Sequence, residues 1–111
     1  MTEYTEENLN MISMKIILHA GDARNQVKKA LDNLEEPDFV EAEHLLVDAS
    51  EKLKKAHEAQ TKAIQDMAAG AKIPYSVLFS HAQDTLMTVM SEYNIAKQLV
   101  KLFSRVQFKE E

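Results

Sequence analysis

Residues 6–34, EENLNMISMKIILHAGDARNQVKKALDNL, carry the pattern that decides the fold. Apolar or small side chains recur in alternating steps of four and three, the spacing of one face of an α-helix. This face consists of Leu9, Ser13, Ile16, Ala20, Ala23, Val27, Ala30 and Leu34. Thr5 is a candidate N-cap, and Glu6 and Glu7 are placed to interact favourably with the helix dipole. Gly21 lies inside the helix beside this face, and we expect close approach of another helix to explain it.

Two further segments repeat this spacing, so the sequence predicts three long helices. In residues 38–69 the face consists of Phe39, Ala42, Leu46, Ala49, Leu53, Ala56, Gln60, Ala63 and Met67. In residues 75–103 it consists of Tyr75, Phe79, Ala82, Leu86, Val89, Tyr93, Ala96, Val100 and Phe103.

The predicted helix ends have recognisable signals. Asp38 with Glu41 is typical of a capping box, and Pro37 at the first helical position is the alternative. Gly70 suits the residue just after a helix, and Pro74 suits the first turn of the third helix.

Short connections between helices of about 30 residues force neighbouring helices to run antiparallel. The sequence therefore predicts an all-α, up-down-up three-helix bundle, elongated and spectrin-repeat-like, with residues 1–111 forming one domain and frayed ends. Many apolar residues lie off the three faces: Met11, Ile12, Ile17, Leu31, Leu45, Ile64, Leu78, Met87, Met90, Ile95, Leu99 and Leu102. Self-association and a wider apolar stripe within one chain explain them equally well.

Composition narrows the class of protein. The chain of 111 residues has 45% hydrophobic residues but only two Gly and two Pro, which favours helix and excludes a disordered chain. It has no cysteine, so disulfides and thiolate chemistry are excluded. A net charge of −5 without a basic stripe argues against nucleic acid as a partner. No apolar run is long enough to span a membrane and the acidic N-terminus is not a secretory signal, so we expect a cytoplasmic protein.

Residues 74–88, PYSVLFSHAQDTLMT, place a polar cluster inside an apolar run. His81 and Asp84 are three residues apart, so a helix puts them on one side, and Thr88 extends that side by one turn. Gln83 is the third polar member of the cluster. An ordinary surface histidine is the simplest interpretation, and a nucleophilic imidazole is the functional alternative.

The other three histidines have weaker signals. Glu41 and His44 have the Glu-x-x-His spacing, but a di-iron bundle needs two such motifs and the sequence has one. His44 and Asp48 have metal-ligand spacing without a third ligand. His19 and His57 lie beside the predicted faces, where packing or a cross-helix hydrogen bond accounts for them.

Three stretches together resemble one known family. The stretch FSHAQDTLMT, residues 79–88, resembles the active-site signature of the enzyme IIA components of the lactose/cellobiose class of the bacterial sugar phosphotransferase system (PTS). Residues 18–24, LHAGDAR, look like the family's first-helix motif, and residues 56–61, AHEAQT, look like its second-helix motif. The resemblance extends from about residue 8 to residue 103, with the motifs in the family's order.

This resemblance implies a homotrimer of three-helix subunits and a specific chemistry. His81 would accept a phosphoryl group from the phosphocarrier protein HPr at its tele nitrogen, Nε2, and pass it to a cysteine of the cognate IIB component. IIB then phosphorylates sugar during import through the membrane component IIC. Gln83 would support the phosphate. Asp84, one per subunit, would lie near the trimer axis, where three copies can bind Mg²⁺ or a similar divalent cation.

The chemistry of the residues is compatible with phosphoryl transfer through His81. A histidine can carry a covalent intermediate, and the cysteine absent here would belong to the partner. Many family members have a second histidine where this chain has Thr85, which leaves any auxiliary role of that histidine open. Ala82 and His19 resemble the cellobiose/β-glucoside branch more than the lactose branch. The alternative is a non-catalytic trimeric helical adaptor or regulatory paralogue, in which His81 is an ordinary residue.

Overall fold

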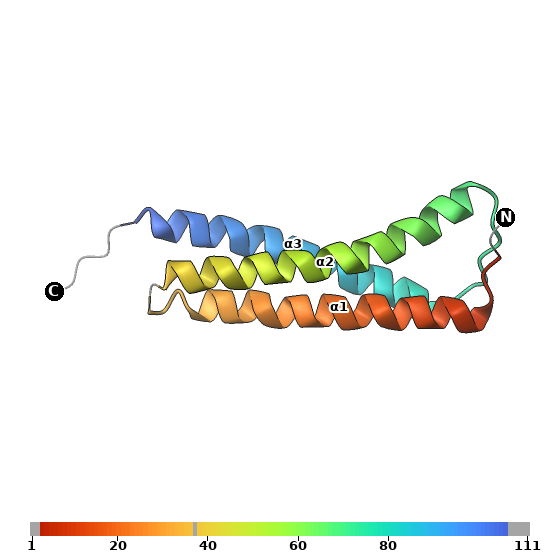
Figure 1. Ribbon diagram of the computed structural model, residues 1–111, viewed down its shortest axis with the longest axis horizontal. Coiled ribbons are helices and arrows are strands. Elements are labelled where there is room, and N and C mark those ends of the chain that lie inside the picture. The colour runs from red at the N-terminus through yellow and green to blue at the C-terminus, as the bar shows by residue number, and fades with distance from the viewer. Residues whose placement is uncertain (1–2, 37, 107–111) are drawn as a thin grey trace.

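The computed structural model describes residues 3–36 and 38–106 as three α-helices. These are α1 (Glu6–Asp32), α2 (Phe39–Ala68) and α3 (Val77–Ser104). They run up-down-up and form a rod of 64 × 20 × 18 Å, so α1 and α3 point the same way and α2 lies antiparallel to both (Figure 1). The predicted all-α three-helix architecture is confirmed.

Small side chains hold the three helices close together. Nine of the fully or almost fully buried residues are alanines: Ala20, Ala23, Ala30, Ala42, Ala49, Ala56, Ala63, Ala82 and Ala96. Leu9, Ile16, Leu86 and Val89 fill the space between them and are also fully buried. Because alanine adds little bulk and favours helix strongly, this seam lets the backbones of long helices approach closely.

The observed helix starts confirm two predicted caps and correct one. The hydroxyl of Thr5 accepts a hydrogen bond from the Asn8 amide, and the Asp38 carboxylate accepts one from the Glu41 amide. The alternative with Pro37 at the first position lies outside the described residues. The third helix begins at Val77 and not at residue 75.

Ser76 is the reason for this later start of α3. Its hydroxyl accepts a hydrogen bond from the Phe79 amide, which satisfies one of the free donors of the first turn. Pro74 therefore lies in the connection, and Tyr75 is 89% exposed and does not belong to the buried face. The predictions that Pro74 lies in the first turn and that Tyr75 lies on the buried face were therefore wrong. The helix starts after the capping serine and not at the proline two residues earlier.

The ends of the predicted faces also differ from the structure. α1 stops at Asp32, so Leu34 follows the C-cap residue Asn33 and is only half-buried. Met67 and Phe103 are at least one-third exposed, because the neighbouring helices no longer cover them at those ends of the rod.

Gly21 does not have the explanation expected from the sequence. A Cβ atom built on this glycine would meet nothing within 4 Å. No other helix of this chain therefore requires glycine at this position.

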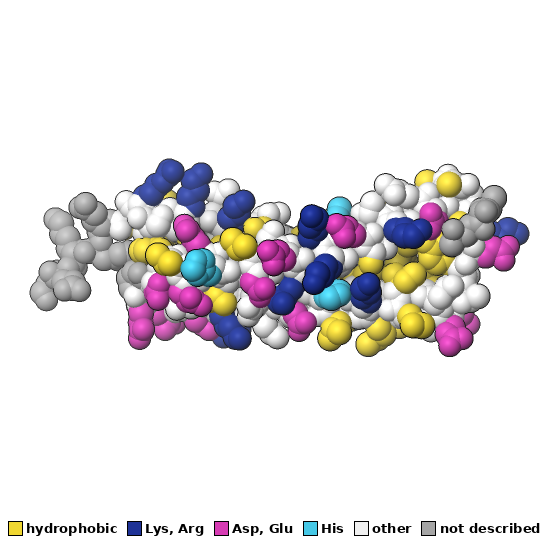
Figure 2. Space-filling view, in the orientation of Figure 1, with side chains coloured by type: hydrophobic (Ala, Val, Ile, Leu, Met, Phe, Trp, Pro, Cys, Tyr) yellow, Lys and Arg dark blue, Asp and Glu magenta, His cyan; other side chains and the backbone are white. Residues whose placement is uncertain are grey.

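The apolar residues off the three faces divide into two groups. Ile12, Ile17, Leu31, Leu45 and Met90 are half-buried against the core, which is the wider stripe. Others stay exposed: Met11, Met14, Leu18, Ile64, Met87, Ile95 and Leu102. Figure 2 shows apolar side chains gathered over the end of the rod where α1 begins. The wider stripe therefore accounts for the first group, and the second group is left uncovered within the described residues.

The connection from α2 to α3 is held by the N-terminal segment. Gly70, with φ of 102°, ends α2 as predicted, and the amides of Gly70 and Ala71 bond back to Met67 and Asp66. The buried Tyr4 donates its hydroxyl hydrogen to the Asp66 carboxylate across 62 residues of sequence. This ties the start of the chain to the last turn of α2, which diverges from α1 at that end (Figure 1).

None of the helices in residues 3–36 and 38–106 combines the length and hydropathy that a membrane crossing requires.

Gln60 provides a first test of the core. It is one of two buried polar side chains in the described residues, and its Oε1 atom accepts no hydrogen bond there. Since an unsatisfied buried acceptor costs free energy, we expect Gln60→Met to raise the free energy of unfolding by about 1 kcal/mol. Urea denaturation at fixed protein concentration measures the change. The exposed Gln65→Met is the control and should change little; a Gln60→Met variant that is less stable would mean that this oxygen has a bound partner.

The Tyr4–Asp66 pair provides a test of pH dependence. The hydrogen bonds from Tyr4 and then Lys62 hold the pKa of Asp66 below its ordinary value. Burial, followed by the hydrogen bond to and charge of Asp66, raises the pKa of Tyr4 to about 12. The contribution of Asp66 to the free energy of unfolding is therefore present at pH values above the ordinary pKa of aspartate. It is lost as the pH falls through the lowered pKa. The contribution of Tyr4 to the free energy of unfolding is full below pH 10.0, the ordinary pKa of tyrosine. It is lost as the pH rises through the raised pKa of about 12.

We therefore expect the stability difference between wild type and Tyr4→Phe to be largest at intermediate pH and to shrink at both extremes. Chemical denaturation of both proteins across the pH range measures it. Parallel stability profiles for the two proteins would contradict the assignment.

Candidate functional site

The first turns of α3 hold the cluster predicted from residues 74–88. The Ser76 cap fixes where the helix starts, and Phe79, Ala82 and Leu86 are buried and fix its rotation about its axis. His81 is exposed in the second turn. Its imidazole makes no hydrogen bond with any side chain of residues 3–36 or 38–106, so both ring nitrogens are available to a partner.

His81 lies on the side of α3 that faces α1. The Thr85 hydroxyl, one turn further along, donates to the His81 carbonyl oxygen at 2.8 Å. Seven residues after Thr85, and therefore on the same side, Glu92 pairs with Arg24 of α1, with Nε and Oε1 2.8 Å apart. This side of α3 is called the α1 flank below.

Gln83 lies on the opposite side of α3. It is half-buried and stands seven and fourteen residues before Met90 and Lys97. Met90 lines a groove with His57 of α2 and other residues, and Lys97 lines a second groove with α2. This side is called the α2 flank. Within one chain, the structure does not bring His81 and Gln83 together.

Asp84 points in a third direction, away from both other helices. It is exposed, and its backbone carbonyl accepts the Thr88 hydroxyl hydrogen at 2.7 Å, so Thr88 does continue this side as predicted. No described side chain pairs with the Asp84 carboxylate. Asp84 shares this outer face of α3 with the exposed residues Val77, Met87, Ser91, Ile95 and Leu102.

The remaining histidines do not form a second site. His44 is exposed, while its candidate co-ligand Asp48 accepts from Gln26 at 2.6 Å and lies 3.5 Å from the ammonium of Lys52. His19 lies beside lysines of α1 and α2. In the part of the chain that the structure describes, no three His, Cys, Asp or Glu side chains are grouped so that they could hold a metal ion.

Two side-chain interactions of the fold and the site have no signal in the sequence. The Arg24–Glu92 pair that marks the α1 flank and the Tyr4–Asp66 bond both join residues more than 60 positions apart. Neither belongs to a short motif, so only the packing of the helices brings the partners together.

The comparisons with known proteins agree with this geometry. The family model for the "PTS system, Lactose/Cellobiose specific IIA subunit" matches residues 11–104. The chain belongs to this family. It is therefore an enzyme IIA component of the phosphotransferase system, a phosphoryl carrier of the lactose/cellobiose class.

Curated relatives of this IIA family are similar over most of their length. The lactose-specific EIIA component of Lactococcus lactis subsp. lactis is 35% identical over 99 residues, which is 89% of this chain and 94% of the relative. The lichenan-specific IIA component of Bacillus subtilis (strain 168) is 37% identical over 100 residues, 90% of this chain and 91% of the relative.

Two solved structures share the fold. PtcA from S. mutans superposes with a TM-score of 0.89 and 36% identity, covering 92% of this chain and all of that one. The chitobiose IIA protein, solved in complex with HPr, superposes with a TM-score of 0.76 and 30% identity, covering 87% of this chain and 94% of that one.

Proposed function

We propose that His81 is the residue that carries the phosphoryl group in this IIA component, with HPr as donor and a IIB component as acceptor. The observation that supports it best is the exposed imidazole of His81 on a rigidly anchored helix, inside the stretch that resembles the family's signature. HPr as partner is supported by the solved complex of the chitobiose relative. The system would serve a cellobiose/β-glucoside or lactose type of sugar, with residues 1–111 acting as one domain.

The proposed transfer needs only the imidazole. The lone pair of neutral Nε2 attacks phosphorus on phospho-HPr, a nitrogen–phosphorus bond forms, and the bond between phosphorus and the donor breaks. In the second step a IIB cysteine thiolate attacks phosphorus, and His81 leaves as the neutral ring. Among the described residues, the side-chain hydrogen bond at His81 goes to its backbone carbonyl and not to its ring, so no side chain holds the imidazole as a base for a water molecule. That suits a carrier, whose phosphohistidine must survive until the acceptor arrives.

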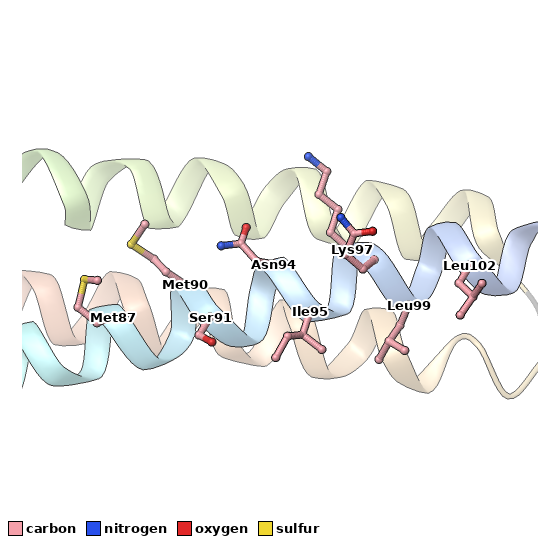
Figure 3. Close-up of a pocket in the computed structure, with 9 residues that line it drawn as sticks. Met87, Met90, Ser91, Asn94, Ile95, Lys97, Leu99 and Leu102 are labelled. Carbon is pink, nitrogen blue, oxygen red and sulfur yellow. The ribbon is translucent and has the colours of Figure 1, made fainter.

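We also propose that three copies assemble through the outer face of α3. Met87 and Ile95 are 55% and 59% exposed on this face, and nothing in the described chain covers them. Figure 3 shows that Ile95, Leu99 and Leu102 project on the side of α3 away from Met90, Asn94 and Lys97. A continuous apolar ridge along a helix is typical of a surface that is buried on association.

Asp84 on the same face fits a divalent cation between the copies. Its exposed carboxylate has no partner within the described residues, and three symmetry-related carboxylates would repel one another. A hard cation such as Mg²⁺ prefers carboxylate oxygens and would neutralise that charge. We assign Asp84 as its ligand, with a role in assembly and not in the transfer step.

His81→Ala tests the carrier assignment. After incubation with phosphoenolpyruvate, enzyme I and HPr, we expect one acid-labile phosphate per wild-type chain and none on His81→Ala, because no other residue is assigned as acceptor. Intact-mass spectrometry measures both. His44→Ala, another exposed histidine, is the control and should label like wild type. Phosphate on His81→Ala would overturn the assignment; no phosphate on wild type would favour the adaptor alternative.

Asp84→Asn tests the cation. We expect Mg²⁺ to raise the melting temperature of wild-type trimer above its value in EDTA by several degrees. The asparagine variant should form a trimer in either condition and respond little, because the charge repulsion is gone. Differential scanning fluorimetry and sedimentation measure these effects. An equal Mg²⁺ response in both proteins would remove Asp84 from the site.

A further inference from the structure

A crevice runs between α1 and α2, away from the site on α3. Two adjoining hollows of about 570 and 470 Å³ lie along it. Lys15, Ala59 and Lys62 line both hollows, so the two are continuous. Of the described residues that line them, none belongs to α3, so the crevice is separate from His81 and from the outer face of α3. Each volume is within the range of small-molecule sites in proteins.

One end of the crevice is basic. Lys15 and His19 line this basic end from α1, and Lys55 and Lys62 line it from α2. Figure 2 shows Lys and Arg side chains gathered over the middle of the rod, with histidines among them. The whole chain has a net charge of −5, so this cluster is a local exception. The summed field of such a cluster attracts an anion.

Two of the ammonium groups are available to a ligand. Lys62 lies 3.1 Å from the Asp66 carboxylate. Among the described residues, Lys15 and Lys55 form no ion pair. Glu58 is the one carboxylate among the described residues that line the basic end. The balance is therefore positive, and a phosphate group suits it, because lysines bind phosphate as point charges on flexible stems.

The other end of the crevice is apolar. Tyr4, Met11 and Ile12 line this apolar end. It lies where α2 diverges from α1, and Figure 2 shows apolar side chains in this opening beside the basic ones (Figures 1 and 2). Met11 is 68% exposed, so an apolar group placed here would remove its surface from water.

One molecule can reach both ends. Ile12 and His19 are seven residues apart on α1, which is about 10 Å along the helix axis. We propose that the α1–α2 crevice binds a phosphate monoester that carries an apolar chain or ring, with the phosphate on the lysines of the basic end and the apolar part in the apolar end. This site goes beyond the proposed phosphoryl transfer and does not depend on it.

Isothermal titration calorimetry with n-octyl phosphate, below its micelle concentration, tests the site. We expect saturable binding of one molecule per wild-type chain. Inorganic phosphate lacks the apolar chain and n-octyl glucoside lacks the charge, so each should bind at least about tenfold more weakly. Equal binding of n-octyl glucoside, or no saturable binding of n-octyl phosphate, would overturn the proposal.

Charge variants test the location of the phosphate, and these exposed side chains can be changed with little effect on the fold. Lys15→Gln/Lys55→Gln should weaken binding of n-octyl phosphate about tenfold, and Glu58→Gln should strengthen it about twofold by removing an opposing charge. Lys29→Gln, at an exposed lysine of α1 outside the crevice, is the matched control and should bind like wild type. A control as weak as the double variant would mean that only net charge matters and would overturn the site.

Chain length tests the apolar end. On wild type, n-butyl phosphate should bind about tenfold more weakly than n-octyl phosphate, because it buries fewer methylene groups. In Met11→Gln this difference should shrink, since the polar side chain offers less apolar surface. Equal affinities of the two phosphates for wild type would overturn the assignment of the apolar end.

The same phosphate monoester chemistry also occurs on a membrane lipid. Sedimentation with phosphatidylcholine vesicles, with and without phosphatidate, separates the two sources. Binding to phosphatidate vesicles that is lost in Lys15→Gln/Lys55→Gln would identify the lipid as the ligand. Binding of n-octyl phosphate without vesicle binding would identify a free molecule. Vesicle binding that the double variant retains, without binding of n-octyl phosphate, would overturn the crevice as the site.

Discussion

The close packing of three helices on an alanine-rich seam is the constraint on which the rest of this structure depends. With Ala20, Ala49 and Ala82 among the fully buried residues, the helix backbones approach closely along this seam, and the molecule is a thin rod of 64 × 20 × 18 Å. A rod that thin cannot cover all of its apolar side chains. The outer face of α3 is therefore left exposed by the same packing that fixes its rotation, and the residues beside His81 take their directions from it.

The site follows from that rotation. Burial of Phe79, Ala82 and Leu86 sends His81 toward α1 and Gln83 toward α2, and leaves Asp84 on the uncovered face between them. One short sequence motif thus directs three side chains to three different sides of the same helix.

Sequence reasoning succeeded where a feature is local. The three helices, the Thr5 and Asp38 caps, the Gly70 helix end and most of the buried face follow from periodicity and short-range hydrogen bonds. It failed at Tyr75 and Pro74, where the serine that follows gives a stronger start signal than the proline. It also failed for Gly21, because the absence of a neighbouring helix at that point cannot be read from one helix alone.

The sequence by itself determined the three-helix fold, the PTS IIA family and His81 as the candidate acceptor, because helix periodicity and motif residues depend only on positions close in the chain. Only the tertiary structure decided that His81 and Gln83 lie on opposite flanks, that Asp84 faces away from both other helices, and that Tyr4 ties the chain start to Asp66. Each of these depends on which side of a helix its neighbours cover, and that is set by the packing of segments far apart in sequence.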